Sequence, residues 1–181
     1  EKLVKKRELQ ALHAELNRLL KWSIYSQLNA EKARLEENVY RIEARISEGN
    51  RIVSRTLGKC DKVWSRLNKV RMKLKRVFFK ASEKGFDDSL IDEYSRLDEE
   101  ITRLIKSYVR LNVKAEIVKY RIRELERERR RIHERIKTVE ARVKEAKEQL
   151  EGQQLDTQTQ GFVTAMDMAA KSFMNTFKDN I

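Results

Sequence analysis

The sequence contains no proline, only five glycines and a single cysteine in 181 residues. Because proline and glycine are the residues that most often end or kink helices, their scarcity favours long uninterrupted helices. Cys60 cannot form a disulfide within the chain, and a lone cysteine is typical of a reducing compartment. No stretch approaches the roughly 18 consecutive apolar residues of a membrane-spanning helix, so we expect no such helix.

Residue patterns that carry enzyme chemistry are also missing. The two histidines, His13 and His133, lie far apart among charged residues, so each is expected at the surface. The sequence has no Cys/His metal spacing, no glycine-rich phosphate loop and no glycine-flanked serine. Cys60 lies in an apolar row and is expected to be a buried packing residue. We therefore expect no catalytic activity, no metal and no cofactor.

The composition that remains is typical of long helices. Charged residues make up 39% of the chain and hydrophobic residues 40%, a mixture found in coiled coils. We predict an all-α protein, an elongated coiled-coil-like helical hairpin with a short C-terminal amphipathic helix. The expected parts are an N-terminal helix (1–50), a basic helical hairpin core (51–152), a linker (153–160) and a short Met/Phe-rich helix (161–181).

Residues 2–47 are predicted to be helical, with a change of phase at residues 21–26. There we expect Trp22 and Tyr25 to pack where another helix crosses. The apolar residues before and after the change form two rows, Leu9, Leu12, Leu16 and Leu19, then Ile24, Leu28, Leu35, Val39, Ile42 and Ile46. Gly49 predicts a kink or short joint in the helix. However, the apolar spacing of four and three residues at Val39, Ile42 and Ile46 resumes in the same phase at Val53.

The strongest turn signal is the segment 83–89. Gly85 is expected to cap one helix, and Asp87 or Asp88 to accept hydrogen bonds at the start of the next. The second arm then keeps a regular heptad from Leu90 to Leu150, interrupted once at Arg129. This pattern predicts a coiled-coil-like helix of about 60 residues, and the short loop predicts an antiparallel hairpin.

The excess positive charge is concentrated in residues 51–82. This segment holds eleven Lys and Arg against one acid, whereas residues 83–181 sum to zero. Its cations recur in steps of four or three, which places them on one helical face. The candidate binding residues on this face are Arg55, Lys59, Lys62, Arg66, Lys69, Lys73, Arg76 and Lys80. An apolar row is expected on the opposite side, about 200° away, made by Cys60, Trp64, Leu67, Leu74, Phe78 and Ala81.

A row of cations has a plain explanation, a solvated helix surface. However, like charges at this spacing repel one another, so solubility alone gains little from the arrangement. The row therefore favours a docking strip for a polyanion, and its charge suits both anionic lipid headgroups and nucleic-acid phosphates. Nucleic acid is the less favoured ligand, because no aromatic residues are interleaved on the basic side for base stacking.

The C-terminal segment 161–181 has an amphipathic pattern rich in methionine and phenylalanine, whose packing is adaptable. Three roles are open for it: a strut folded back on the hairpin, a contact between subunits, or insertion into a membrane interface. For the subunit contact, the candidate self-assembly residues are Met166, Ala169, Ala170, Phe173 and Phe177.

Residues 164–173, Thr-Ala-Met-Asp-Met-Ala-Ala-Lys-Ser-Phe, look like the third core helix of the ESCRT-III family, the charged multivesicular body proteins. Phe173 stands where that family more often has methionine. The hairpin from about Lys59 to Arg123 is similar in design to the family's first two helices. The sequence departs from the family in its longer second arm, in an extra helix at 1–50, and in containing no acidic C-terminal half.

The resemblance implies a cytoplasmic subunit, peripheral on membranes, that polymerises with like subunits on an anionic membrane and remodels it. It also implies an AAA-type ATPase partner, bound through regions not present in this sequence. Two other functions stay open: a coiled-coil adaptor whose partners are other helices, and a helical coat protein that binds the nucleic-acid backbone.

Overall fold

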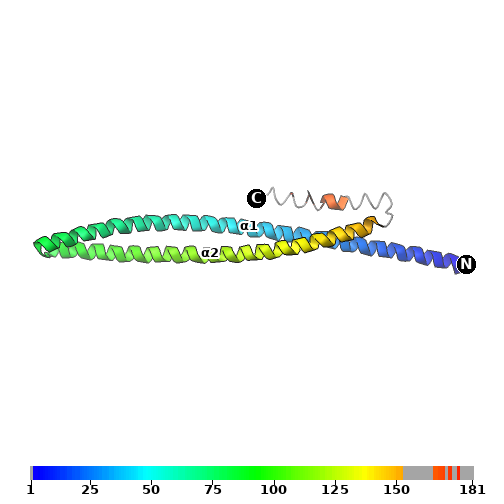
Figure 1. Cartoon of the computed structure of the whole chain (residues 1–181), viewed down its shortest axis with the longest axis horizontal. Coiled ribbons are helices and arrows are strands. Elements are labelled where there is room, and N and C mark those ends of the chain that lie inside the picture. Colours follow the sequence, from blue (N-terminus) through cyan, green and yellow to red (C-terminus); the bar gives the residue numbers. More distant parts are fainter. Residues whose placement is uncertain (1, 153–164, 170, 173–174, 176–181) are drawn as a thin grey trace. The chain divides into compact units, whose positions relative to one another are not determined.

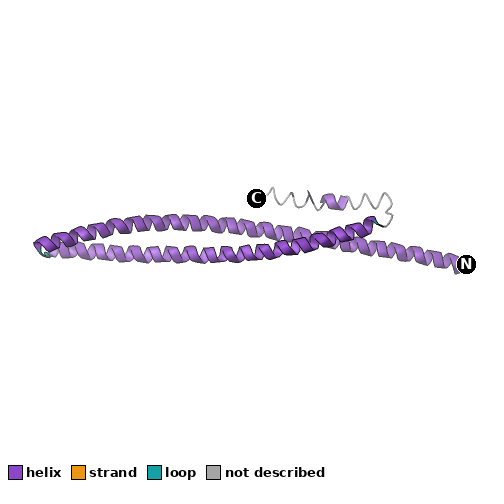
Figure 2. Ribbon diagram, viewed as in Figure 1, coloured by secondary structure: helices purple, strands orange, loops and turns teal. Residues whose placement is uncertain are grey.

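The computed structural model describes residues 2–152, 165–169, 171–172 and 175. Two long helices, α1 (Lys2–Lys84) and α2 (Asp88–Glu151), pack as a hairpin, and a short helical piece follows at 165–169 (Figures 1 and 2). The predicted all-α hairpin is thereby confirmed. The expected linker, 153–160, lies outside the described residues. Within the described part, no helix is long and apolar enough to cross a membrane.

The chain divides into two compact units, and both helices contribute to each. One unit contains Glu1–Glu43 and Arg127–Ile181, and the other contains Ala44–Glu126. We call the first the terminal unit and the second the turn unit, because the turn between α1 and α2 lies in it.

The turn is built as its sequence predicts. Gly85 has φ +81°, a left-handed conformation that a residue with a side chain rarely adopts, and its N–H donates to the Ala81 carbonyl at 2.9 Å. Asp87 caps α2, because its carboxylate accepts a hydrogen bond from the Leu90 N–H at 2.8 Å. Gly85 thus supplies a hydrogen bond to a free carbonyl group at the end of α1, and Asp87 accepts one from a free N–H group at the start of α2.

The residues of α2 that face α1 are those the heptad predicts. They run at steps of four and three from Leu90 to Leu150, and all are buried or half-buried except Tyr94 at the turn end. In the terminal unit, Ile136 and Val139 form a buried cluster with Leu35 and Val39 of α1. A second cluster joins Tyr25 to Leu150, with Trp22 packed against it. The predicted packing role of Trp22 and Tyr25 is therefore confirmed.

Helix α1 is continuous through Gly49, so the predicted joint there is wrong. Gly49 is buried in the contact between the helices instead of ending one. A Cβ atom on Gly49 would lie 2.9 Å from Cγ1 of Ile122 on α2, a clash. The absent side chain therefore lets α2 approach α1 closely, and the residues 1–50 and 51–84 belong to one helix.

The face that α1 turns toward α2 keeps one heptad phase from Tyr25 to Ala81. In the turn unit its members, which we call seam residues, are Ile46, Gly49, Val53, Thr56, Cys60, Val63, Leu67, Val70, Leu74, Val77 and Ala81, all buried or half-buried. Cys60 is buried as predicted. Trp64 and Phe78 are not seam residues, because they are 46% and 57% exposed. The expected apolar row is therefore wrong at these two positions.

Candidate polyanion-binding face

The eight predicted cations of α1 lie on one flank of the contact between the helices. Each immediately precedes a seam residue, as Arg55 precedes Thr56 and Lys80 precedes Ala81, and all eight side chains are exposed. One residue is about 100° of helical rotation. The cations are therefore beside the seam, and the prediction that they lie opposite the apolar row is corrected.

An ion pair shows which side of α2 this flank meets. The Arg66 guanidinium donates to the Glu100 carboxylate through Nε at 3.1 Å and Nη2 at 2.8 Å. Glu100 immediately precedes the α2 seam residue Ile101, just as Arg66 precedes Leu67. In this antiparallel pair, the residues before the seam therefore point to the same side from both helices. We call that side of the turn unit the basic face.

Helix α2 adds five exposed cations to the basic face. They precede the α2 seam residues in the same way and are Arg96, Arg103, Arg110, Lys114 and Arg121. These five cations were not predicted from the sequence, because the charges of residues 83–181 sum to zero, which hides the local excess on one side. Their signal was present in the sequence: each stands one position before a predicted heptad residue.

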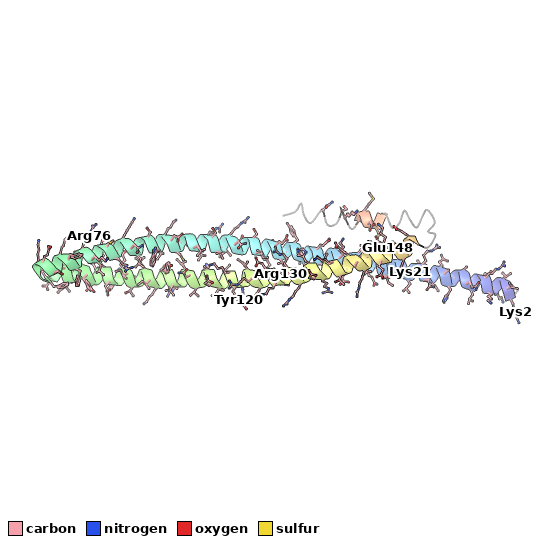
Figure 3. All side chains as sticks on the ribbon, viewed as in Figure 1. Lys2, Lys21, Arg76, Tyr120, Arg130 and Glu148 are labelled. Carbon is pink, nitrogen blue, oxygen red and sulfur yellow. The ribbon has the colours of Figure 1, made fainter. Side chains whose placement is uncertain are left out.

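Between Arg55 and Arg121 the basic face carries thirteen cations against two acids, Glu93 and Glu100, and its other charged positions are Arg45, Glu48 and Glu124. Among the residues that the structure describes, Arg66 is the only one of the thirteen in an ion pair. From Arg55 to Lys80 the α1 row extends over about 38 Å of helix. In Figure 3 the Arg76 side chain projects outward from α1 near the turn. The face is thus a long row of charges compensated by few protein partners.

The other flank of the turn unit differs in character. We call it the apolar face, and it consists of the residues that immediately follow seam residues. Trp64 and Phe78 on α1 and Ile105 on α2 belong to it and are exposed. A groove of about 570 Å³ on this side is lined by Trp64, Ile105 and Tyr108 among others. No aromatic side chain occupies a position of the basic face, so that face offers phosphate or headgroup contacts without base stacking.

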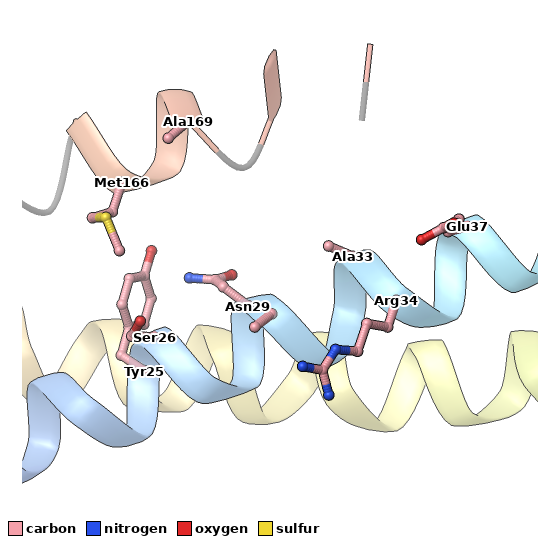
Figure 4. A pocket seen from close by; sticks show the side chains of 9 residues that line it. Tyr25, Ser26, Asn29, Ala33, Arg34, Glu37, Met166 and Ala169 are labelled. Atoms are coloured by element: carbon pink, nitrogen blue, oxygen red, sulfur yellow. The ribbon is translucent and has the colours of Figure 1, made fainter. Parts of the chain in front are cut away.

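The C-terminal candidates divide into described and undescribed residues. Met166 and Ala169 line a groove of about 430 Å³ together with Tyr25, Ala30 and Ala33 of α1 (Figure 4). The predicted self-assembly residues Ala170, Phe173 and Phe177 lie outside the described residues. Met166 and Ala169 thus face the chain's own α1, as in a folded-back strut, and their role in self-assembly stays a prediction.

Asp167 joins the short helix to both long helices of the terminal unit. The Tyr25 hydroxyl donates to its carboxylate at 2.5 Å, and Lys147 Nζ lies 3.4 Å from the other carboxylate oxygen. Burial, followed by the hydrogen bond to the negatively charged Asp167, raises the pKa of Tyr25 to about 12. These contacts link the short helix to α1 and α2 within the terminal unit.

Nothing in the described residues groups three His, Cys, Asp or Glu side chains as a metal site would. In comparisons with known proteins, the chain matches no family model, no curated protein and no solved structure. The fold and the charge distribution are therefore the observations from which function must be argued.

Proposed function

We propose that this chain is a peripheral subunit that docks its basic face on an anionic membrane surface. The observation that carries the proposal is the convergence of thirteen exposed cations from both helices on one side of the turn unit, with one ion pair among them in the described chain. Unpaired charges are available to external anions, whereas charges already paired within the protein are not.

The mechanism is electrostatic and additive. A basic residue close to an anionic leaflet contributes about 1 kcal/mol, an attraction that decays within a Debye length. Cations on two antiparallel helices can contact neighbouring headgroups at once, so many weak contacts add up to attachment. The absence of aromatic side chains from the basic face favours a headgroup surface over single-stranded nucleic acid, which proteins hold largely by stacking on its bases.

Assembly on the membrane is the second part of the proposal. Polymerisation with like subunits would multiply the attachment, because each bound copy raises the effective concentration of the next. Polymerisation, membrane remodelling, a cytoplasmic location and an ATPase partner rest on the resemblance of residues 164–173 and of the hairpin to the ESCRT-III family.

The test is co-sedimentation of the chain with vesicles of phosphatidylcholine alone and of phosphatidylcholine with phosphatidylserine. We expect binding to the anionic vesicles only, with a decrease as salt rises. Reversal of four basic-face residues should abolish it; the variant is Lys62→Glu, Arg66→Glu, Lys69→Glu and Lys73→Glu. A matched control reverses four exposed cations away from the basic face, Arg51, Lys75, Lys106 and Arg123, and should retain most of the binding.

Equal loss in the two variants would show that net charge alone matters and would sink the assignment of the face. A parallel arm with duplex DNA separates the two polyanions. The chain could instead bind DNA and not anionic vesicles, with the logarithm of its affinity falling linearly with the logarithm of salt concentration. That result would show that the basic face binds nucleic-acid phosphates. Binding to neither would favour the coiled-coil adaptor.

A further inference from the structure

The apolar face of the turn unit leaves large hydrophobic side chains in water. On α1 these are Leu57, Trp64 and Phe78, and on α2 they are Ile91, Ile105 and Val109, each at least 37% exposed. They immediately follow seam residues, so they form a surface that continues directly from the buried contact between the helices. Six such side chains on one side of a single hairpin are unusual for a surface that meets only solvent.

The centre of this face is hollowed. Trp64 and Tyr108 pack with their ring centroids 5.4 Å apart, and they form one wall of the 570 Å³ groove. Arg71 and Asp98 also line the groove, on opposite helices. Lys75 is a second cation at its edge. An apolar depression with charged residues at its sides is a shape that a complementary surface can fill.

The register of the hairpin orders these residues in levels. Trp64 packs on Tyr108, and Cys60 Sγ lies 3.9 Å from Asn112 Oδ1. Counting in heptads from the Trp64–Tyr108 contact along antiparallel helices sets Arg71 level with Ile101 and Phe78 level with Tyr94. The apolar-face residues of α2 on either side of these levels are Ile105 and Val109 for Trp64, Asp98 and Thr102 for Arg71, and Ile91 and Ser95 for Phe78.

We propose that the apolar face binds the apolar face of a second copy of this chain, related by a two-fold axis parallel to the hairpin. Such an axis places α1 of one copy against α2 of the other at every level. Trp64 and Phe78 then meet Ile105 and Ile91 of the second copy. Arg71 meets Asp98 of the second copy, and Asp98 meets Arg71. At these three levels the face is complementary to itself, in hydrophobicity and in charge.

The alternative two-fold axis, perpendicular to the hairpin, does not share this property. It sets α1 against α1 and brings Arg71 of one copy toward Arg71 of the other when it is centred on that level. Like charges brought together at an interface oppose association. Neighbouring helices of the turn units are antiparallel in both arrangements, as in a four-helix bundle, so the charges decide between them.

A dimer of this kind has a consequence for the basic face. Within a turn unit the basic and apolar faces lie on opposite flanks of the seam. Covering both apolar faces therefore leaves two basic faces pointing away from each other. The inference does not depend on what the basic face binds, because the oligomeric state can be measured without lipid or nucleic acid.

The first experiment compares two neighbouring phenylalanines in the full chain. Phe78 belongs to the apolar face, whereas Phe79, although 68% exposed, lies a further 100° away from the seam. In sedimentation equilibrium, Phe78→Ser should raise the dimer dissociation constant about 100-fold, because the change acts once in each copy and each loss is about tenfold. Phe79→Ser should leave the dissociation constant within about threefold of the parent.

The second experiment tests the axis by mixing two charge variants. Arg71→Glu gives a copy with two acids at its central level, and Asp98→Arg gives a copy with two bases. Each variant alone should dimerise poorly, because like charges then meet across the interface. An equimolar mixture should form heterodimers, since every acid of one copy then meets a base of the other. Repair of a contact within one hairpin cannot explain a rescue that requires mixing.

The outcomes decide the proposal in either direction. Loss of association with Phe78→Ser and rescue by mixing support it. A parent chain that stays monomeric at about 100 µM overturns it, as does equal weakening by Phe78→Ser and Phe79→Ser. Failure of the mixture to associate, with both variants folded by circular dichroism, overturns the proposed two-fold arrangement.

Discussion

Gly49→Ala provides a sharp test of the close approach between α1 and α2. Alanine is favoured over glycine inside a helix by about 1 kcal/mol. Changing a solvent-exposed helical glycine to alanine therefore stabilises the protein by about that amount. At Gly49 the new methyl group would lie 2.9 Å from Cγ1 and 3.1 Å from Cδ1 of Ile122. Overpacking of this kind costs about 1–3 kcal/mol, which offsets or exceeds the gain.

Gly58 is the matched control, because a Cβ added there meets no atom within 4 Å. Gly58→Ala should therefore raise the free energy of unfolding by about 1 kcal/mol. Gly49→Ala should fall about 1–3 kcal/mol below it. The measurement is urea unfolding of the full chain, followed by circular dichroism at 222 nm, with the midpoints compared at equal slopes.

A double-mutant cycle assigns the difference to one contact. Ile122→Ala removes the atoms that the new methyl would strike, at the cost of a cavity. In that background Gly49→Ala should stabilise by about 1 kcal/mol, as Gly58→Ala does. If Gly49→Ala stabilises the parent chain as much as Gly58→Ala, the two helices are not in close contact at Gly49 and the structural argument fails.

Two further predictions concern the pKa of Tyr25 and the helix cap. The unfolded tyrosine ionises near pH 10 while Tyr25 in the fold stays protonated to about pH 12, so the stability from Tyr25 is full below pH 10 and is lost as pH rises to 12. Tyr25→Phe should remove this loss of stability. It should also remove the last step in a spectrophotometric titration of the tyrosines, and an unchanged titration would contradict the contact with Asp167. Asp87→Ala should lower stability by about 1 kcal/mol and Asp88→Ala by less, because Asp87 caps Leu90; equal losses in thermal unfolding would argue against that assignment.

The second helix could be predicted nearly completely, because its seam is marked by leucine, isoleucine and valine at almost every heptad position. Even the interruption at Arg129 has a structural counterpart, since Arg129 is half-buried and lies 4.0 Å from Glu43 of α1. Where large aliphatic residues occupy the seam and polar residues surround it, the pattern and the packing coincide.

The phase of α1 could not be predicted from the same rule. Four of its eleven seam residues in the turn unit are small or weakly apolar, Gly49, Thr56, Cys60 and Ala81, whereas Trp64 and Phe78 are large and exposed. A search for bulky residues therefore draws Trp64 and Phe78 into the predicted row, although they lie beside the seam. Which residues are buried was decided by the close approach of α2, a tertiary property that the α1 sequence does not carry alone.

The candidate site was predicted in part for the same reason. The α1 cations were found because they dominate their segment, but their position relative to the seam depended on the corrected phase. The five cations of α2 were masked by acids in the same stretch, several of which, such as Asp92, Asp98 and Glu99, lie off the basic face. Only the paired register, fixed by Arg66 and Glu100, places both sets on one face.

The central claim is that the binding surface is built by both helices, and a variant in α2 alone tests it most directly. Affinity for anionic vesicles should be measured for the triple variant Arg96→Glu, Arg103→Glu and Arg110→Glu, and for the charge-matched variant Lys106→Glu, Lys119→Glu and Arg123→Glu. The first removes three basic-face cations, each worth about 1 kcal/mol, and should lose binding strongly while the second retains most of it. Binding by the first variant at the level of the second would contradict a basic face shared between α1 and α2.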